Sequence, residues 1–576
     1  MAASAKRWGH GLIAMSLVFC GALSAQAAPS VEWSAEVGLG GWVVPGKFAP
    51  LRIDLTAASE GLGLLEVTVP QAGGGRVTHR RAIRLAPGAR QQITFEVTVT
   101  DPRRPITVRL RRDGDEIARQ EIRVGSGRVA EGIVAALTPE RAGLEFLASG
   151  SRRRAAYLVE ATMPSRWQFY DAADLVVLDA LLASTLLPAQ QEALVGWVAQ
   201  GGRLLVVPRD GLPAEPWLAA LLPARVGPPA HLPGFPFPLL RLSPEVPTER
   251  TGEEDFPLAV RRRFGLGLVE LWAFDPFSPA ARAWPGRVGL WQSLLATPGP
   301  TAAVPPALID ELPRTRPLPG STQVALAGLS VAYLAAMRLV LRRWSGLRGG
   351  WILVPAVVGV FATALYAVAS GAREAARSIA QVSVVEVLPE ARRARVTTVV
   401  SLIAPYGGSV TAHLPAGAAV RLLEDGWIVL DESARTVTGG ARRGSVALEV
   451  RQIIEIDLYA AVVDSAAAPQ LLFSGDSPPP VDGLLARGRQ IYRLGSGPVP
   501  RRMPLDPAGW TTWDRPGVLG TDLASRAVEV LLAHLAQRPE ELWLVGRHVD
   551  DRTALRLPGG GMGESSRLLL LPVTLP

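Results

Sequence analysis

The side chains best placed to do chemistry follow two apolar runs in the first half of the chain. Asp179 lies near the end of DLVVLDA (174–180), and Arg209 and Asp210 directly follow RLLVVP (203–208). If both runs are parallel strands, their carboxyl ends meet at the edge where open α/β sheets bind ligands. We therefore predict Asp179, Arg209 and Asp210 as candidate crevice residues. Desolvated carboxylates there could act as general acid and base; the alternative is that they are solvated loop residues and helix caps.

Asp171 precedes the first of these runs and Asp174 begins it, so both join Asp179 in one acidic set; other chemical patterns are weaker. The histidines after residue 27 lie far apart, and none has a second His or Cys at the spacing of a metal site. GGGMG (559–563) lacks a following Lys, so we expect a loop there and not a phosphate cradle. We predict no catalytic residue, no metal and no cofactor.

The segment 127–296 alternates apolar runs with helical ones. We predict strands at 132–137, 155–160, 174–180 and 203–208, a helix at 187–202, two further strands within 257–274 joined at 265–267, and a closing helix at 284–296. Apolar strands alternating with helices indicate a parallel sheet covered on both faces. The intervening segment 209–256 is rich in Pro and Gly, and we expect surface loops.

This segment resembles a known family over about residues 130–296. DLVVLDA…LPAQQEALVGWVAQGGRLLVV and RRRFGLGLVELWAFDP are similar to the class I glutamine-amidotransferase-like domain of bacterial membrane proteins. The family's enzymes use a Cys nucleophile with His and Glu. Cys20 is the only cysteine here and lies near the amino terminus, so the resemblance implies the α/β fold without the activity. Similar domains occur in accessory subunits of ABC transporters and in gliding-type machinery.

The segments on either side are rich in β-branched residues. Short alternating strands over 28–126 predict an immunoglobulin-like β-sandwich, with a hairpin turn at Asp113-Gly114 and His79 on a sheet face. Strand patterns return over 371–576, which we predict to be a second β-rich domain. Within it, 522–538 reads as an amphipathic helix that packs on the neighbouring sheet; a position on the membrane surface is the alternative.

Two apolar stretches near the middle of the chain predict a transmembrane hairpin over 324–369. They cover 324–341 and 351–369 and are 18 and 19 residues long, close to the roughly 20 residues that span a bilayer. The short turn between them is basic. The Pro-rich stretch 297–323 reads as an extended linker that leads to the membrane. Two buried helices of a soluble protein are the alternative.

Residues 1–27 read as a signal peptide. Lys6 and Arg7 precede an apolar run at 11–23, and Ala25-Gln26-Ala27 is a small-x-small cleavage site at Ala25 and Ala27. The signal directs residues 28–320 outward, and the hairpin returns residues 371–576 to the same side, whether or not cleavage occurs. We therefore expect a bacterial cytoplasmic-membrane protein with both large segments extracytoplasmic. Lipidation of Cys20 is the alternative, although Phe19 precedes it where lipoprotein signals have a small residue.

The composition narrows the range of partners. The formal charge is +8, but the arginines are scattered in pairs and triplets and not gathered on one helix with aromatic residues, so we predict no nucleic-acid binding. The lipid bilayer and an unidentified membrane or envelope protein are the expected partners. We predict a non-catalytic binding or scaffold protein of the cell envelope. The alternatives are an accessory subunit of a membrane transporter and an envelope hydrolase using Asp179 and Asp210.

Overall fold

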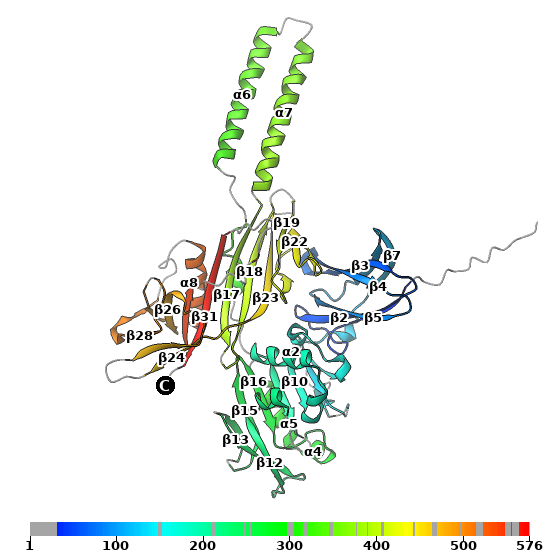
Figure 1. Cartoon of the computed structure of the whole chain (residues 1–576), viewed down its shortest axis with the longest axis vertical. Helices are drawn as coiled ribbons and strands as arrows, with labels where there is room; N and C mark the ends of the chain where they lie inside the picture. Colours follow the sequence, from blue (N-terminus) through cyan, green and yellow to red (C-terminus); the bar gives the residue numbers. More distant parts are fainter. Residues whose placement is uncertain are drawn as a thin grey trace, which may run out of the picture.

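A computed structural model gives the arrangement of the chain (Figure 1). It describes residues 31–574 except 140, 142, 148–151, 209–214, 247, 254, 297–304, 315–319, 345–349, 376, 389, 405–407, 442–443, 464–468, 496, 514–521, 539, 548–554 and 556–563. The described residues form mainly β-sheets, with few helices. The prediction of a β-rich protein with two long apolar helices is confirmed at this level.

Residues 31–122 form two facing sheets. The first pairs β1 (Val31–Val37), β2 (Phe48–Ala57) and β5 (Arg90–Thr98); the second includes β3 (Gly61–Pro70), β4 (Arg76–Leu85), β6 (Ile106–Arg112) and β7 (Asp115–Ile122). Their inner faces share a core in which Leu51, Phe95 and Val108 are fully buried. The predicted turn at Asp113-Gly114 joins β6 to β7, with positive φ at both residues as a tight hairpin requires.

The next sheet has five parallel strands. The order is β9 (Arg153–Leu158), β8 (Gly132–Leu137), β10 (Ala173–Asp179), β11 (Arg203–Val207) and β16 (Gly267–Trp272), followed by antiparallel β15 (Pro257–Phe264) and β14 (Glu249–Gly252). Helix α2 (Pro188–Ala199) connects β10 to β11, and α4 (Pro279–Ala283) and α5 (Gly286–Ala296) follow β16. The strands are buried because both faces are covered.

The expectation of loops over 209–256 is partly wrong. This segment contains α3 (Pro216–Ala219), β14, and a two-stranded ribbon of β12 (Ala224–Ala230) and β13 (Leu239–Pro244). Pro228 and Pro229 lie in β12, which has a single partner strand. Proline is tolerated there because the missing N–H would face away from the ladder. The Pro content of the segment 209–256 predicts loops, but part of this segment forms the edge strand β12.

The carboxyl-terminal part is built on a twelve-stranded sheet. Nine strands follow one another in hydrogen-bonded order: β20 (Ala419–Leu422), β23 (Ser445–Glu455), β18 (Arg393–Ile403), β17 (Ser378–Leu388), β31 (Glu564–Thr574), β30 (Leu542–Arg547), β26 (Val481–Arg487), β27 (Gln490–Arg493) and β29 (Trp510–Thr512). Three more strands branch from this order: β24 (Tyr459–Val463), β25 (Gln470–Ser474) and β28 (Arg502–Pro504). Helix α8 (Leu523–Leu535) packs on this sheet through Leu523, Leu531 and Leu535, which confirms its predicted position.

Three carboxyl-terminal strands join the amino-terminal sandwich. They are β19 (Val410–His413), β22 (Thr436–Gly440) and β21 (Trp427–Asp431), and β21 pairs in parallel with β4. The second sheet of the sandwich therefore has seven strands in the order β19-β22-β21-β4-β3-β6-β7. The segments that we predict as separate domains, 28–126 and 371–576, share one sheet.

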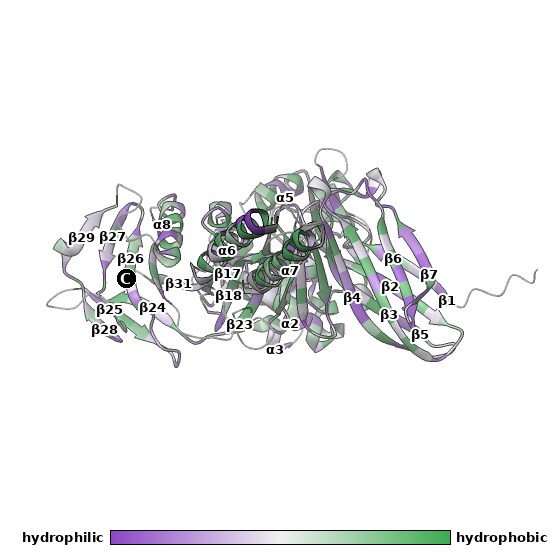
Figure 2. Cartoon of the chain, turned by 90° about the horizontal axis from the view of Figure 1, so that it is seen from above, coloured by the Kyte–Doolittle hydropathy of each residue, from purple (hydrophilic) through white to green (hydrophobic). Residues whose placement is uncertain are grey.

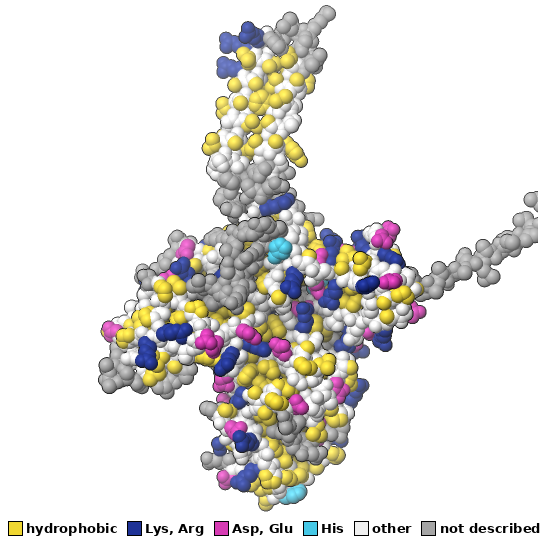
Figure 3. Space-filling model, in the orientation of Figure 1, with side chains coloured by type: hydrophobic (Ala, Val, Ile, Leu, Met, Phe, Trp, Pro, Cys, Tyr) yellow, Lys and Arg dark blue, Asp and Glu magenta, His cyan; other side chains and the backbone are white. Residues whose placement is uncertain are grey.

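Helices α6 (Gly320–Trp344) and α7 (Gly350–Ala375) project together from this body (Figure 1). Both are long and apolar enough to cross a membrane, and none of the residues in their apolar windows is buried. They lie side by side and contact each other through Tyr333 and Phe361. Seen along the pair, they stand over β17 and β18, between the amino-terminal sandwich and α8 (Figure 2). Figure 3 shows their mainly apolar surface, which contrasts with the charged body.

Residues 305–314, within the stretch 297–323 that we predict as an extended linker, pack on the body. A short 3-10 helix, η6 (Pro306–Ile309), places Leu308 and Leu312 in the core beneath β18 and α8. Glu311 pairs with Arg526 at 3.4 Å, and Arg314 pairs with Glu424 at 3.2 Å. On the other side of the helix pair, α7 leads into β17 across only two residues. Residues 305–314, which precede α6, and β17, which follows α7, thus belong to the same core.

We predict that Leu308→Ala lowers the free energy of unfolding by about 2–5 kcal/mol, because it opens a cavity where η6 packs on β18 and α8. Leu62→Ala is the matched control: Leu62 is 75% exposed, so its removal should cost well under about 1 kcal/mol. Denaturant unfolding of both variants in the same detergent measures the difference. Equal losses would contradict the packed position of residues 305–314.

Candidate functional site

The structure gives Asp179 a capping role. β10 and β11 are neighbours, with Asp179 opposite Val207, as the crevice prediction requires. However, Asp179 is only 1% exposed, and its Oδ1 accepts a hydrogen bond from the backbone N–H of Leu181 at 3.0 Å. The carboxylate therefore caps the 3-10 helix η5 (Ala180–Thr185). Arg209 and Asp210 lie outside the described residues, as do Ala25 and Ala27 of the predicted cleavage site.

A charged cavity lies at the opposite edge of the parallel sheet from Asp179, where β9, β10 and β11 begin. Its volume is about 600 Å³. It separates the parallel sheet from β18, β20 and β23, and Val44 and Lys47 of the amino-terminal part close one side. The charged lining residues are Lys47, Glu131, Arg153, Asp171, Asp174, Arg203, Arg395, Arg421, Glu449 and Arg451. We call this space the junction cavity.

Asp171 connects the three soluble parts at this cavity. It precedes β10, and its Oδ2 accepts a hydrogen bond from the backbone N–H of Phe48 at 3.2 Å. Its Oδ1 lies 3.9 Å from the ammonium of Lys47 and 3.5 Å from the guanidinium of Arg451 on β23. One carboxylate thus holds the sandwich and the carboxyl-terminal sheet against the parallel sheet.

Several arginines of the junction cavity pair with carboxylates. Arg451 Nε lies 2.5 Å from Glu449 Oε1, and Arg421 pairs with the other oxygen of the same carboxylate. Burial raises the pKa of Glu449, but the two arginines outweigh it and bring the pKa below its usual range. Arg153 likewise pairs with Asp174 at 2.7 Å. The cavity wall is therefore a preorganised charge network, held in one geometry by the packing of three parts.

A second connection runs through Arg395 on β18. Its Nε donates to Glu386 on the neighbouring strand β17 at 3.0 Å, and Nη1 donates to the backbone oxygen of Gln200 at the end of α2 at 3.1 Å. Glu386 is only 1% exposed. The same side chain thus neutralises a buried carboxylate within one sheet and holds the helix of the neighbouring sheet.

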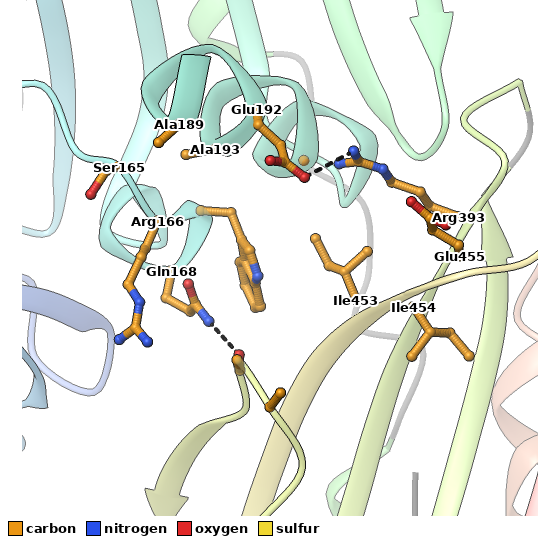
Figure 4. A pocket seen from close by; sticks show the side chains of 14 residues that line it. Ser165, Arg166, Gln168, Ala189, Glu192, Ala193, Arg393, Ile453, Ile454 and Glu455 are labelled. Carbon is orange, nitrogen blue, oxygen red and sulfur yellow. Dashed lines mark hydrogen bonds and ion pairs between the residues drawn. The ribbon is translucent and has the colours of Figure 1, made fainter. Parts of the chain in front are cut away.

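An open hollow of about 330 Å³ lies beside the junction cavity, between α2 and strands β18 and β23. Figure 4 shows Glu192 and Arg393 reaching toward each other across it, with their ion pair at 3.3 Å, and Ile453 and Ile454 along one side. The amide of Gln168 donates to the backbone oxygen of Gly417 at 3.0 Å. The hollow has polar bridges at its sides and apolar residues between them.

Glu96 on β5 is the most perturbed acid near the junction. It is 8% exposed, and its Oε1 has no hydrogen-bond partner among the residues that the structure describes. Burial raises its pKa from 4.5 to about 8, and the carboxylates of Glu432 and Asp171 raise it further. Arg166, at 3.8 Å, and Arg451 lower the pKa but do not offset burial. Glu96 is therefore mainly protonated at neutral pH.

Sequence reasoning found some of these residues and missed others. Asp171 and Asp174 belong to the acidic set that we singled out, yet they lie at the amino edge of the sheet and not at the carboxyl edge with Asp179. Glu449 and Arg451 were missed, although their spacing of two residues on a predicted strand indicates one common face. Among the described residues, no group of three or more His, Cys, Asp and Glu side chains is arranged to hold a metal ion.

Comparison with known proteins gives little functional information. Residues 30–125 match the model of a domain of unknown function, DUF8726. No curated protein matches the chain. Similar solved structures include the alkylpurine DNA glycosylase AlkC of Pseudomonas fluorescens bound to DNA with an abasic site analog (16% identity, 17% of this chain, 30% of that one, TM-score 0.13). Another is the Paenibacillus cycloisomaltooligosaccharide glucanotransferase with cycloisomaltoheptaose (14% identity, 26% of this chain, 20% of that one, TM-score 0.14). These matches span less than a third of either solved chain.

We predict that Glu96→Gln removes part of the pH dependence of stability. Between pH 4.5 and about 8 the folded protein keeps a proton on Glu96 that the unfolded chain releases, so the free energy of unfolding of the native sequence should fall as pH rises through this window. Glu96→Gln cannot ionise and should show a smaller fall. Denaturant unfolding at pH 5 and pH 9 measures both slopes, and identical slopes would contradict the raised pKa of Glu96.

We also predict that Arg395→Met costs about 3–5 kcal/mol of unfolding free energy, because it leaves Glu386 buried without a cation. The double variant Glu386→Gln, Arg395→Met should regain much of that loss. Arg487→Met, at an exposed strand end, is the control and should change stability little. If the double variant were no more stable than Arg395→Met alone, the ion pair would not be the cause.

Proposed function

We propose that this chain is a membrane-anchored, non-catalytic binding or scaffold protein of the bacterial cell envelope, with both large segments outside the cytoplasmic membrane. One observation carries the proposal. The chain contains two apolar, unburied helices, and a strand from before this pair is hydrogen-bonded in one sheet to a strand from after it. A hairpin that crosses the bilayer twice is consistent with such pairing, since it leaves both segments on one side. A single crossing is not.

The charge distribution of the helix pair supports the proposed orientation in part, since Arg314 and Arg377 flank the end of the pair near the body. Arg338, Arg342 and Arg343 lie toward the end of α6 that is farthest from the body. Figure 3 shows Lys and Arg side chains gathered at this end of the pair. Basic residues in short loops favour the cytoplasmic side. The body then faces the envelope, as the predicted signal peptide requires.

The junction cavity is the proposed contact for a partner or ligand. Its network of paired charges is already formed, so a polar group that enters would meet oriented donors and acceptors with little reorganisation. The α/β part, with its resemblance to amidotransferase-like domains without the nucleophile, supplies one wall. Since the cavity lies where three parts meet, an occupant would contact all three at once, as a scaffold role requires.

An accessory subunit of a membrane transporter is the second candidate. The observation that favours it is a groove of about 350 Å³ between α6 and α7, lined by Tyr333, Leu334, Phe361 and Leu365, which a helix of a partner could fill. Photo-crosslinkers placed at Gly359 and Ala367 should then capture a multispanning protein. The hydrolase alternative is weakened, because Asp179 is committed to a helix cap.

We predict that the full chain stays with the membrane fraction after washing with high salt and at alkaline pH, and that detergent releases it. Integral helices resist both washes because their apolar surface is removed from water. Release by salt alone would show peripheral binding through charge and would contradict the proposal.

Partner binding can be tested through Lys47, the only lysine after Lys6. In intact membranes, an amine-reactive crosslinker should attach a partner through Lys47 at the mouth of the junction cavity. Lys47→Arg keeps the charge but cannot react, so it separates these products from those formed at the amino terminus. Identical product patterns from the two proteins would count against a contact at this cavity.

A further inference from the structure

The edge of β4 is the feature of the fold that most needs a partner. The region matched by the DUF8726 model ends at residue 125, so it contains β3, β4, β6 and β7 but none of the strands that cover the far side of β4. Without them, β4 would be an edge strand with a free row of backbone donors and acceptors. Val77 and His79 on this strand are 5% and 3% exposed in the complete chain. The module alone is therefore an incomplete sandwich.

Residues 410–440 complete it in a defined register. Five successive residues of β21 pair in parallel with β4, from Trp427 opposite Arg76 to Asp431 opposite Arg80. One row of facing residues then runs across six of the seven strands: Thr411, Thr438, Val429, Thr78, Thr68 and Thr107. The row has hydroxyl hydrogen bonds on both sides of the β4–β21 boundary, at 2.8 Å between Thr411 and Thr438 and at 3.2 Å between Thr68 and Thr78.

Side chains fix the end of this pairing. Glu432 follows β21, accepts from Arg81 Nε at 2.9 Å and lies 3.8 Å from His79 Nδ1. The hydroxyl of Ser433 accepts from the backbone N–H of Ala82 at 2.9 Å. Burial raises the pKa of Glu432, but the hydrogen bonds and charges of His79 and Arg81 outweigh it and bring the pKa below its usual range. The contact combines backbone ladder, core and charge, as strand addition to a sheet edge does.

The shared sheet also spans two cores. Val67 and Val108, on one side of β4, pack against the first sheet of the sandwich. Val77, Ile428 and Leu430 pack against Val400 and Leu448 of the twelve-stranded sheet. β21 reaches β4 only after the chain has passed through α6 and α7, which separate the two strands in sequence.

We propose that β4 is a strand-acceptor edge whose partner is the segment 410–440 of the same chain, and that this pairing closes after both apolar helices have crossed the membrane. Closure then fixes the two soluble segments on one side and prevents the hairpin from changing its orientation. The timing rests on the proposed membrane function; the acceptor edge itself does not.

The test uses the full chain in bacterial cells, in a Cys20→Ser background that removes the native cysteine. Thr78→Cys with Val429→Cys places two cysteines directly opposite each other on β4 and β21, within the roughly 4.4–6.8 Å between Cα atoms that a disulfide allows. Thr68→Cys with Val429→Cys is the matched control, since two strand spacings, or about 9.5 Å, separate its positions. We expect an intramolecular disulfide in the first pair and its loss in the second.

A third protein tests the order of events. Val358→Arg with Val360→Arg puts two charges in the middle of α7, so the second crossing should fail and residues 378–574 should stay in the reducing cytosol. We expect loss of the 78–429 disulfide. Ser370→Arg, near the end of α7 that leads into β17, should keep the disulfide. A disulfide that persists in the Val358→Arg, Val360→Arg protein would overturn the proposed order.

The outcomes separate this inference from the proposed function. Absence of the 78–429 disulfide in a chain that resists the alkaline wash would overturn the acceptor edge and leave the membrane function intact. A disulfide in a chain that salt releases would support the acceptor edge and overturn the membrane function. A bridged dimer would show that β4 takes the strand of a second copy, which overturns closure within one chain.

Discussion

The parallel pairing of β4 with β21 is the constraint on which the rest of the structure depends. It joins residues that are about 350 positions apart in sequence and lie on opposite sides of the helix pair. Because a sheet cannot be hydrogen-bonded through a bilayer, this pairing requires an even number of membrane crossings between its two strands. Two apolar helices of the right length lie between them. The sheet and the helices thus impose consistent conditions on the position of each segment.

The charged junction follows from the same arrangement. With the sandwich and the twelve-stranded sheet fixed to each other, the parallel sheet has two surfaces to pack against, and Asp171 contacts both. Burying charge there is costly unless every group is matched. Glu449 and Glu386 are matched by arginines, whereas Glu96 avoids the cost by keeping its proton. The nearest cation to Glu96, Arg166, is 3.8 Å away, and burial therefore raises the pKa of Glu96.

Local patterns in the sequence predicted the elements better than their partners. The strands 132–137, 174–180 and 203–208 are visible as apolar runs, and the Asp113-Gly114 turn follows from its residue types. The pairing of β21 with β4 could not be predicted, because alternation identifies a strand but says nothing about a neighbour far away in sequence. The position of Asp171 beside Arg451 depends on that distant pairing too. The packed segment 305–314 did carry a signal, since Leu308 and Leu312 are four residues apart, but its proline content obscured it.

The most direct test of the account is the labelling of single cysteines in intact spheroplasts with a thiol reagent that cannot cross membranes, in the Cys20→Ser background. Asp113→Cys lies on an exposed turn before the helix pair in sequence, Arg487→Cys lies at an exposed strand end after it, and Arg343→Cys lies at the far end of α6. The account predicts labelling of the first two before lysis and of Arg343→Cys only after lysis. Labelling of just one of the two soluble positions before lysis would place them on opposite sides of the membrane and contradict the shared sheet.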